Sequence, residues 1–162
     1  MLETKSLINS KSPGINVHLV QTDLGKLDTI ETTFAEAASY AKHQQMILLH
    51  NAGTLGITTK LAIEITDPEL IQDHLAINYT SMFTLTSHFL SHFKTGHRMI
   101  INHTSTAAFR FCPSYSQYSA CKAARNAYMG VLAVENPDVR VLSYSPDPVD
   151  TDMLQKRVIL RR

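Results

Sequence analysis

Three residues of this chain have the types and the spacing needed to deliver a proton to a carbonyl oxygen. Tyr118 and Lys122 lie four residues apart, and Ser105 lies thirteen residues before Tyr118. On a helix, residues i and i+4 share one face, so the two side chains can converge on one ligand. An ammonium group favours the charged form of a nearby phenol, and a serine hydroxyl can donate a hydrogen bond to an oxygen that gains negative charge. The spacing therefore predicts proton delivery during reduction of a carbonyl group.

The Tyr-x-x-x-Lys spacing is weak by itself, because many helices carry it as an exposed pair. Three other segments of the sequence strengthen the prediction. Ser105, the turn at 51–53 and the proline-flanked loop at 147–151 each follow an apolar run of the kind that forms a buried strand. Because ligands of α/β sheets bind at the carboxyl ends of parallel strands, we expect these segments to meet there.

Apolar patterning predicts the elements that must position these residues. Compact apolar or β-branched runs predict strands at 17–21, 46–50, 98–102 and 139–144. Apolar residues at helical spacing predict helices from about 27 to 43, 67 to 93 and 115 to 134. Asp67 and Pro68 supply the N-cap and first residue of the second helix, and Asn78 inside it favours a kink or a polar role. Apolar strands that alternate with helices predict an α/β, doubly wound Rossmann-type parallel sheet with both faces covered.

Composition excludes several classes of protein. A chain of 162 residues with 44% hydrophobic and 18% charged residues is typical of one globular domain, and a net charge of +1 favours neither nucleic acid nor a membrane surface as a partner. The chain lacks an apolar run long enough to cross a bilayer. Two cysteines, Cys112 and Cys121, are too few for a disulfide framework and favour a cytoplasmic location.

Two further features have a plain and a functional interpretation. His88 and His92 are four residues apart with His97 close behind, which is possible zinc geometry, but no further ligand cluster accompanies them. We interpret them as surface histidines and predict no metal site. The basic C-terminal segment at 156–162 is interpreted as a solvated tail. The alternative is a weak binding patch for a membrane or a protein partner.

Four segments carry a resemblance to a known family: NAGTLG at 51–56, NYTSM at 78–82, YSACKAAR at 118–125 and VRVLSYSPDPVDTDM at 139–153. With them the chain resembles the short-chain dehydrogenase/reductase family, and within it the sepiapterin reductases, from about Val17 to Met153. The resemblance implies reduction of a pterin side-chain carbonyl with NADP(H) during tetrahydrobiopterin biosynthesis. It also implies a homodimer formed through the helices near 67–93 and 115–134.

The resemblance also implies a role for each matching residue. Tyr118 would be the general acid, Lys122 would make it more acidic and hold the nicotinamide ribose, and Asn78 would support a water-linked proton path. The catalytic residues are thus Ser105, Tyr118, Lys122 and Asn78. The substrate would contact Thr104, Ser105, Tyr118 and Asp147. Besides Tyr118 and Lys122, the residues that match the cofactor site are Asp23, Leu24, Asn51, Ala52, Gly53, Val149, Asp150, Thr151, Asp152 and Met153.

The four strands match strands 3, 4, 5 and 6 of the family, whereas strands 1, 2 and 7 and the glycine-rich phosphate turn are missing from the sequence. We therefore expect a single partial domain over 1–162, family-like to 153, with a divergent basic tail at 154–162. In the family's strand order two vacant strand positions would separate the segment 17–21 from 46–50, which leaves its backbone groups without a partner. Such a chain is expected to be marginally stable by itself. Two interpretations remain open: an NADP-dependent carbonyl reductase, or a catalytically inactive truncated fragment that at most associates with full-length subunits.

Overall fold

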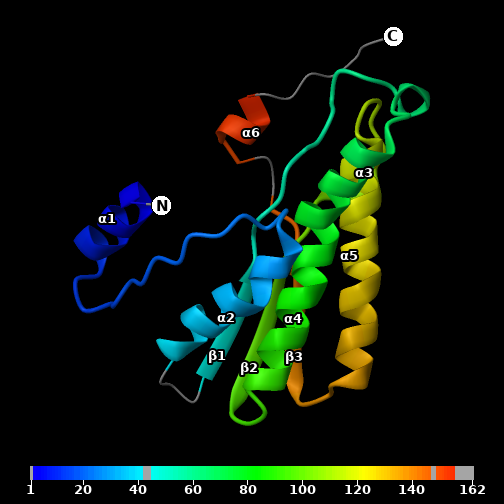
Figure 1. The fold of residues 1–162 in the computed structure, drawn as a ribbon. Helices are drawn as coiled ribbons and strands as arrows, with labels where there is room; N and C mark the ends of the chain where they lie inside the picture. Colours follow the sequence, from blue (N-terminus) through cyan, green and yellow to red (C-terminus); the bar gives the residue numbers. More distant parts are fainter. Residues whose placement is uncertain (1, 42–44, 147–148, 156–162) are drawn as a thin grey trace.

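A sheet of three parallel strands forms the centre of the fold in the computed structural model (Figure 1), which describes residues 2–41, 45–146 and 149–155. The strands are β1 (Gln45–His50), β2 (His97–His103) and β3 (Val139–Tyr144), hydrogen-bonded in the order β1-β2-β3. Leu48, Ile100 and Val141 share one row of the sheet. The prediction of an α/β fold with a parallel sheet is confirmed, and these three strands are the ones predicted at 46–50, 98–102 and 139–144.

Helices connect the strands and cover one face of the sheet. In Figure 1, α4 and α5 lie along the sheet, and α2 contacts α4. The longer helical elements are α1 (Leu2–Lys11), α2 (Ile30–Ser39), α3 (Pro68–Leu75), the π segment η3 (Ala76–Thr80), α4 (Ser81–His92) and α5 (Ser116–Glu135). The short ones are η1 (Leu27–Thr29), η2 (Ala62–Glu64), η4 (Thr106–Ala108) and α6 (Asp152–Gln155). Among the described helices none has the length and apolarity to span a membrane.

The predicted start of the second long helix is confirmed in atomic detail. Asp67 accepts a hydrogen bond from the Glu69 backbone N–H at 2.9 Å, and Pro68 occupies the first helical position. This cap satisfies one of the free donors at the helix end. The helix predicted as continuous from 67 to 93 is instead interrupted by η3, whose centre is Asn78. The sequence predicts a kink or a polar role at Asn78, because asparagine has a low helix propensity.

The core lies between the sheet and the α4–α5 pair. Its buried residues are Met82, Phe89, Ile100, Met129, Leu132 and Val139. The opposite side is different: Ile47 and Leu49 of β1 are 54% and 57% exposed, and Leu142 and Tyr144 of β3 are 45% and 55% exposed. We call these four residues the open sheet face. The expectation that helices cover both faces was therefore wrong for the described residues, since α2, α4 and α5 pack together on one side.

The predicted strand at 17–21 was also wrong, because the structure has no strand there. A strand is stable only when its N–H and C=O groups pair with a neighbour, and no described strand lies beside this segment. Instead, the ring of His18 stacks on Tyr40 with 4.0 Å between ring centres. The helix α1, which the sequence patterning did not predict, buries none of its residues.

Candidate active site

An open cleft of about 640 Å³ is lined by the segments that follow β1, β2 and β3 and by the start of α5. This is the edge of the sheet where ligands of α/β proteins bind. The predicted site residues that line it are Asn51, Ala52, Gly53, Thr104, Ser105, Tyr118, Lys122, Val149, Thr151 and Met153. The structure therefore brings most of the predicted catalytic and cofactor residues together around one space.

Other predicted site residues lie elsewhere. Asp23 and Leu24 do not line the cleft, and the Asp23 carboxylate accepts a hydrogen bond from the Gly25 N–H at 3.0 Å within its own turn. Asp150 and Asp152 are exposed and also do not line it. Asp147, predicted to contact substrate, lies outside the described residues.

Lys122 is almost fully buried and touches both the sheet and Tyr118. Its Nζ lies 5.4 Å from the centre of the Tyr118 ring and donates a hydrogen bond to the His103 carbonyl oxygen at 2.6 Å. Burial, and then the positive charge of Arg125, lower the pKa of Lys122 from 10.5 to about 7. The bond to the carbonyl favours the charged amine, but desolvation outweighs it. The amine next to Tyr118 can therefore change its charge near neutral pH.

Ser105 and Thr104 present hydroxyl groups at the end of β2. Ser105 caps η4, and its Oγ accepts a hydrogen bond from the Ala107 N–H at 3.2 Å, which leaves the hydroxyl proton free to donate. Thr104 is 5% exposed, and its Oγ1 has no hydrogen-bond partner within the described part of the chain. A buried hydroxyl without a partner is rare in proteins, so a polar ligand at this wall would satisfy it.

Asn78 lies behind the cleft wall, where η3 places it. The side chain is 1% exposed; its Oδ1 accepts from the Thr54 N–H at 2.9 Å, and its Nδ2 donates to the His74 carbonyl oxygen at 3.1 Å. Asn78 thus ties the loop after β1 to the α3–α4 helix.

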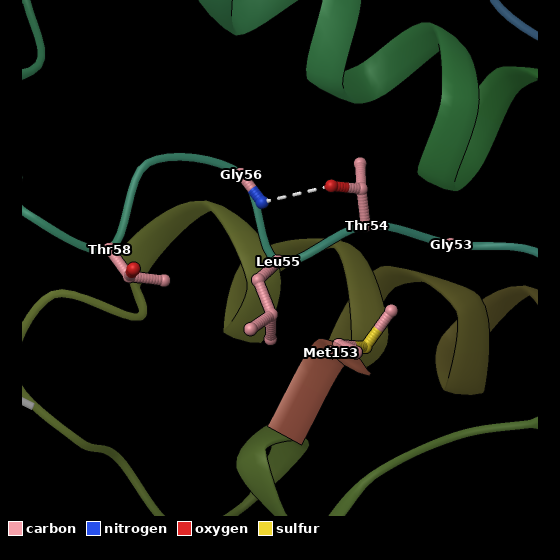
Figure 2. A pocket seen from close by; sticks show the side chains of 6 residues that line it. All are labelled: Gly53, Thr54, Leu55, Gly56, Thr58 and Met153. Carbon is pink, nitrogen blue, oxygen red and sulfur yellow. Dashed lines mark hydrogen bonds between the residues drawn. The ribbon is translucent and has the colours of Figure 1, made fainter. Parts of the chain in front are cut away.

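The same loop lines a second, smaller pocket of about 270 Å³ that adjoins the cleft. Figure 2 shows Leu55 from the loop and Met153 from α6 on the same side of the loop, and both residues, together with Gly53, line both spaces. The Gly56 N–H donates to Thr54 Oγ1 at 3.4 Å across the bend of the loop (Figure 2).

Gly56 has a φ of +72°, which favours glycine, and an added Cβ would lie 2.6 Å from His74 Nδ1. The loop therefore packs closely on α3.

Sequence reasoning did not single out Arg110, Tyr115 and His103, which line the cleft, or Arg125, which lies beside it. His103 lines the cleft, and its Nδ1 lies 2.6 Å from Asn51 Oδ1, so this nitrogen carries the proton, because Oδ1 can only accept. Burial, Lys122 and Arg125 lower the pKa of His103. Arg125 lies below the cleft and is 1% exposed. Its position in the YSACKAAR segment, seven residues after Tyr118, placed it on the same helix face and was the signal available in the sequence.

No group of three or more His, Cys, Asp or Glu side chains in the described residues is arranged to hold a metal ion. His88 and His92 instead contact the ring of Phe34, each with 5.9 Å between ring centres.

The family model for short chain dehydrogenase matches residues 2–159. The chain therefore belongs to the short-chain dehydrogenase family.

Within that family the chain is similar to sepiapterin reductases. It is 36% identical over 160 residues to sepiapterin reductase of Bos taurus, covering 95% of this chain and 59% of the relative. It is 35% identical over 159 residues to sepiapterin reductase of Rattus norvegicus, covering 94% of this chain and 61% of the relative. The chain thus spans about three fifths of the length of these curated relatives.

Solved structures share the fold. The crystal structure of the KRED1-Pglu enzyme matches with a TM-score of 0.79 at 28% identity, covering 94% of this chain and 62% of that one. The alcohol dehydrogenase of Thermococcus sibiricus, complexed with 5-hydroxy-NADP, matches with a TM-score of 0.79 at 23% identity, covering 93% of this chain and 62% of that one. The second likeness concerns the fold alone.

Proposed function

We propose that this chain carries the carbonyl-reducing site of an NADP(H)-dependent reductase of the sepiapterin reductase type, with a pterin side-chain carbonyl as substrate. The observation that carries the proposal is the single cleft lined by Ser105, Tyr118 and Lys122 together with the Asn51–Gly53 turn. The 36% identity with a sepiapterin reductase supports the pterin class of substrate.

The residues of the cleft fit the nicotinamide and ribose end of NADP(H). Thr104 offers a buried hydroxyl that has no partner among the described residues, Lys122 offers a buried amine, and the Asn51–Gly53 turn offers backbone groups. The sequence holds no glycine-rich phosphate turn of the family's kind, so the fit concerns this end of the cofactor. When bound, NADPH supplies the hydride. Asp23, Leu24, Val149, Asp150, Thr151, Asp152 and Met153 remain part of the proposed cofactor site by resemblance.

The protein's own part in the reaction is proton delivery. Tyr118 donates its hydroxyl proton to the substrate oxygen, and the free hydroxyl proton of Ser105 donates a hydrogen bond to the same oxygen. The Lys122 amine, when charged, stabilises the negative charge left on Tyr118. Asn78 holds the adjacent loop through Thr54, which suits its proposed place beside a water-linked proton path.

Three further parts of the proposal concern the assembly, the location and the domain extent of the protein. A homodimer through α3–α4 and α5 is supported by apolar residues exposed on these helices: Phe83 is 43%, Val131 55% and Val134 82% exposed. A cytoplasmic location suits two cysteines that form no disulfide. Residues 1–162 are proposed to form one partial domain, with 154–162 as its tail.

A second candidate function is a catalytically inactive chain that associates with full-length subunits. One observation favours it: the open sheet face exposes the apolar side chains of Ile47 and Leu49, which a full-length subunit would cover.

Titration of the purified chain with NADPH, followed by nicotinamide fluorescence, and an assay with sepiapterin test the first proposal. Tyr118→Phe should lower turnover by about 10²- to 10⁴-fold and leave NADPH affinity nearly unchanged, because the phenyl ring keeps the shape but loses the proton. Tyr40→Phe, a change at an exposed tyrosine outside the cleft, is the matched control. Absence of NADPH binding at millimolar cofactor would favour the inactive chain, and full activity of Tyr118→Phe would rule out Tyr118 as the proton donor.

A further inference from the structure

Arg125 is a charged residue that the proposed proton delivery does not use, and it is 1% exposed. Its Nε donates to Asn102 Oδ1 at 2.9 Å, one terminal nitrogen donates to the Ala52 carbonyl oxygen at 3.2 Å, and the other donates to the His50 carbonyl oxygen at 2.7 Å. All three acceptors are uncharged. Burying a cation costs desolvation free energy unless the cation is both paired with an anion and hydrogen-bonded. Since the acceptors of Arg125 are uncharged, its burial lowers the stability of the fold.

The three acceptors show what Arg125 connects. Ala52 belongs to the turn after β1, His50 is the last residue of β1, and Asn102 lies on β2. The guanidinium comes from α5, the helix that carries Tyr118 and Lys122. One side chain therefore joins the cofactor-side turn, two strand ends and the helix of the proposed proton donor.

The charge of Arg125 acts on the groups around it. Burial lowers the pKa of Lys122 and of His103, and the charge of Arg125 lowers both further. Burial also lowers the pKa of Arg125 itself, and the charge of Tyr118 partly offsets this. Because an arginine in a protein stays protonated, its charge persists where that of Lys122, whose pKa is about 7, begins to disappear. The titratable and charged groups that interact with Arg125 are His50 from β1, His103 from β2, and Tyr118, Cys121 and Lys122 from α5. Arg110 and Tyr115, from the loop before α5, line the same cleft as Tyr118 and Lys122. Tyr144 from β3 lies against the ring of His103.

We propose that Arg125 is a positioning residue of this site, which ties the Asn51–Gly53 turn to α5 and holds a permanent positive charge behind Tyr118 and Lys122. The proposal rests on the proposed function for its meaning, since a charge at this place favours the anion that proton donation leaves on Tyr118. The physical arrangement itself can be tested without any turnover.

The test of the charge is a nuclear magnetic resonance titration of the 162-residue chain labelled with ¹³C at the lysine Cε. In the wild type the Lys122 signal should titrate near pH 7. Arg125→Met and Arg125→Gln remove the charge and should raise this midpoint by about one pH unit or more, because two cations three residues apart on a helix repel each other. Arg125→Lys keeps a charge and should leave the midpoint close to that of the wild type. Arg140→Met, which removes an exposed arginine of β3, is the matched control.

Hydrogen exchange at the Thr54 amide tests whether Arg125 holds the Asn51–Gly53 turn to α5. Thr54 directly follows this turn, and its N–H donates to Asn78. A lysine amine cannot reach three oxygens in the geometry of a guanidinium. Arg125→Lys should therefore speed this exchange by about tenfold, and the exchange of Ala107 in the turn after β2 should stay unchanged.

A folded Arg125→Met or Arg125→Gln protein whose Lys122 midpoint equals that of the wild type would overturn the proposal. If neither neutral variant folds, Arg125→Lys decides, and unchanged exchange at Thr54 would overturn the proposal. Failure of the wild type to bind NADPH would contradict the proposed function. It would not affect the Lys122 titration or the Thr54 exchange, because neither measurement uses cofactor.

Discussion

His50 should make the stability of this protein fall steeply with acid. The residue is 5% exposed at the end of β1, and its Nε2 lies 2.8 Å from Thr86 Oγ1. Thr86 Oγ1 already donates to the Met82 carbonyl oxygen, so it accepts from His50, whose ring carries its proton on Nε2. Burial, and then the charge of Arg125, lower the pKa of His50 from 6.5 to about 3. The folded protein therefore holds His50 neutral at a pH where the unfolded chain protonates it.

This difference sets the size of the effect. The unfolded chain binds the proton as the pH falls below 6.5, whereas the folded protein does so only near pH 3, so acid favours the unfolded state between these values. At pH 5 the contribution of His50 is a loss of about 2 kcal/mol relative to pH 7, since each unit below the unfolded pKa costs about 1.4 kcal/mol. Burial also lowers the pKa of His74 and of His103, so the total loss in the wild type should be larger.

Urea unfolding at pH 7 and pH 5 measures the effect. His50→Gln keeps an N–H donor for Thr86 but cannot titrate, so the difference in unfolding free energy between the two pH values should shrink by about 2 kcal/mol. His97→Gln, a change at an exposed histidine at the start of β2, should keep the wild-type difference. If His50→Gln loses as much stability between pH 7 and pH 5 as the wild type, the account of His50 is wrong.

Two more predictions concern the loop after β1 and the open sheet face. Gly56→Ala should destabilise the fold by about 1–3 kcal/mol in urea unfolding, because φ is +72° and the new Cβ would meet His74 at 2.6 Å. Gly14→Ala, where no atom lies within 4 Å of the new Cβ, should change stability by less than about 0.5 kcal/mol, and equal losses in the two variants would contradict the argument. The purified chain should show no cooperative thermal transition above about 50 °C in calorimetry, because Leu49 and Leu142 remain 57% and 45% exposed in the folded chain and so contribute only part of their burial energy. A sharp transition above that temperature would contradict this.

The parts of the fold that could be predicted from the sequence are those in which local pattern and burial agree. The runs at 46–50 and 98–102 are largely apolar, and the two strands that they form pair with each other in the sheet. Their sequence pattern therefore predicted both strands correctly. The segment 17–21 has a similar pattern but forms no strand, because a strand depends on a neighbour that local sequence does not report.

The site shows the same division. The spacing from Ser105 to Lys122 placed its residues around one cleft, since each follows a strand or shares a helix face. The hydrogen bonds of Arg125 could not be predicted in the same way. They depend on carbonyl oxygens of Ala52 and His50, more than seventy positions away in sequence, and every residue type supplies such an oxygen. A hydrogen bond to a backbone atom does not require a particular residue type at the acceptor position, so the sequence does not reveal it.

The π segment η3 accommodates an extra residue between α3 and α4. A π bulge holds one residue more than the α-helical turn that would replace it. Removing one residue from 76–80 would therefore restore a regular α-helical turn and leave α3 and α4 in nearly the same orientation, because the wide turn takes up the extra residue within itself. Deleting Asn78 should keep His74 beside Gly56 but remove the side-chain oxygen that accepts from the Thr54 N–H. The extra residue thus supplies a side chain for the loop after β1 without changing the course of the helix.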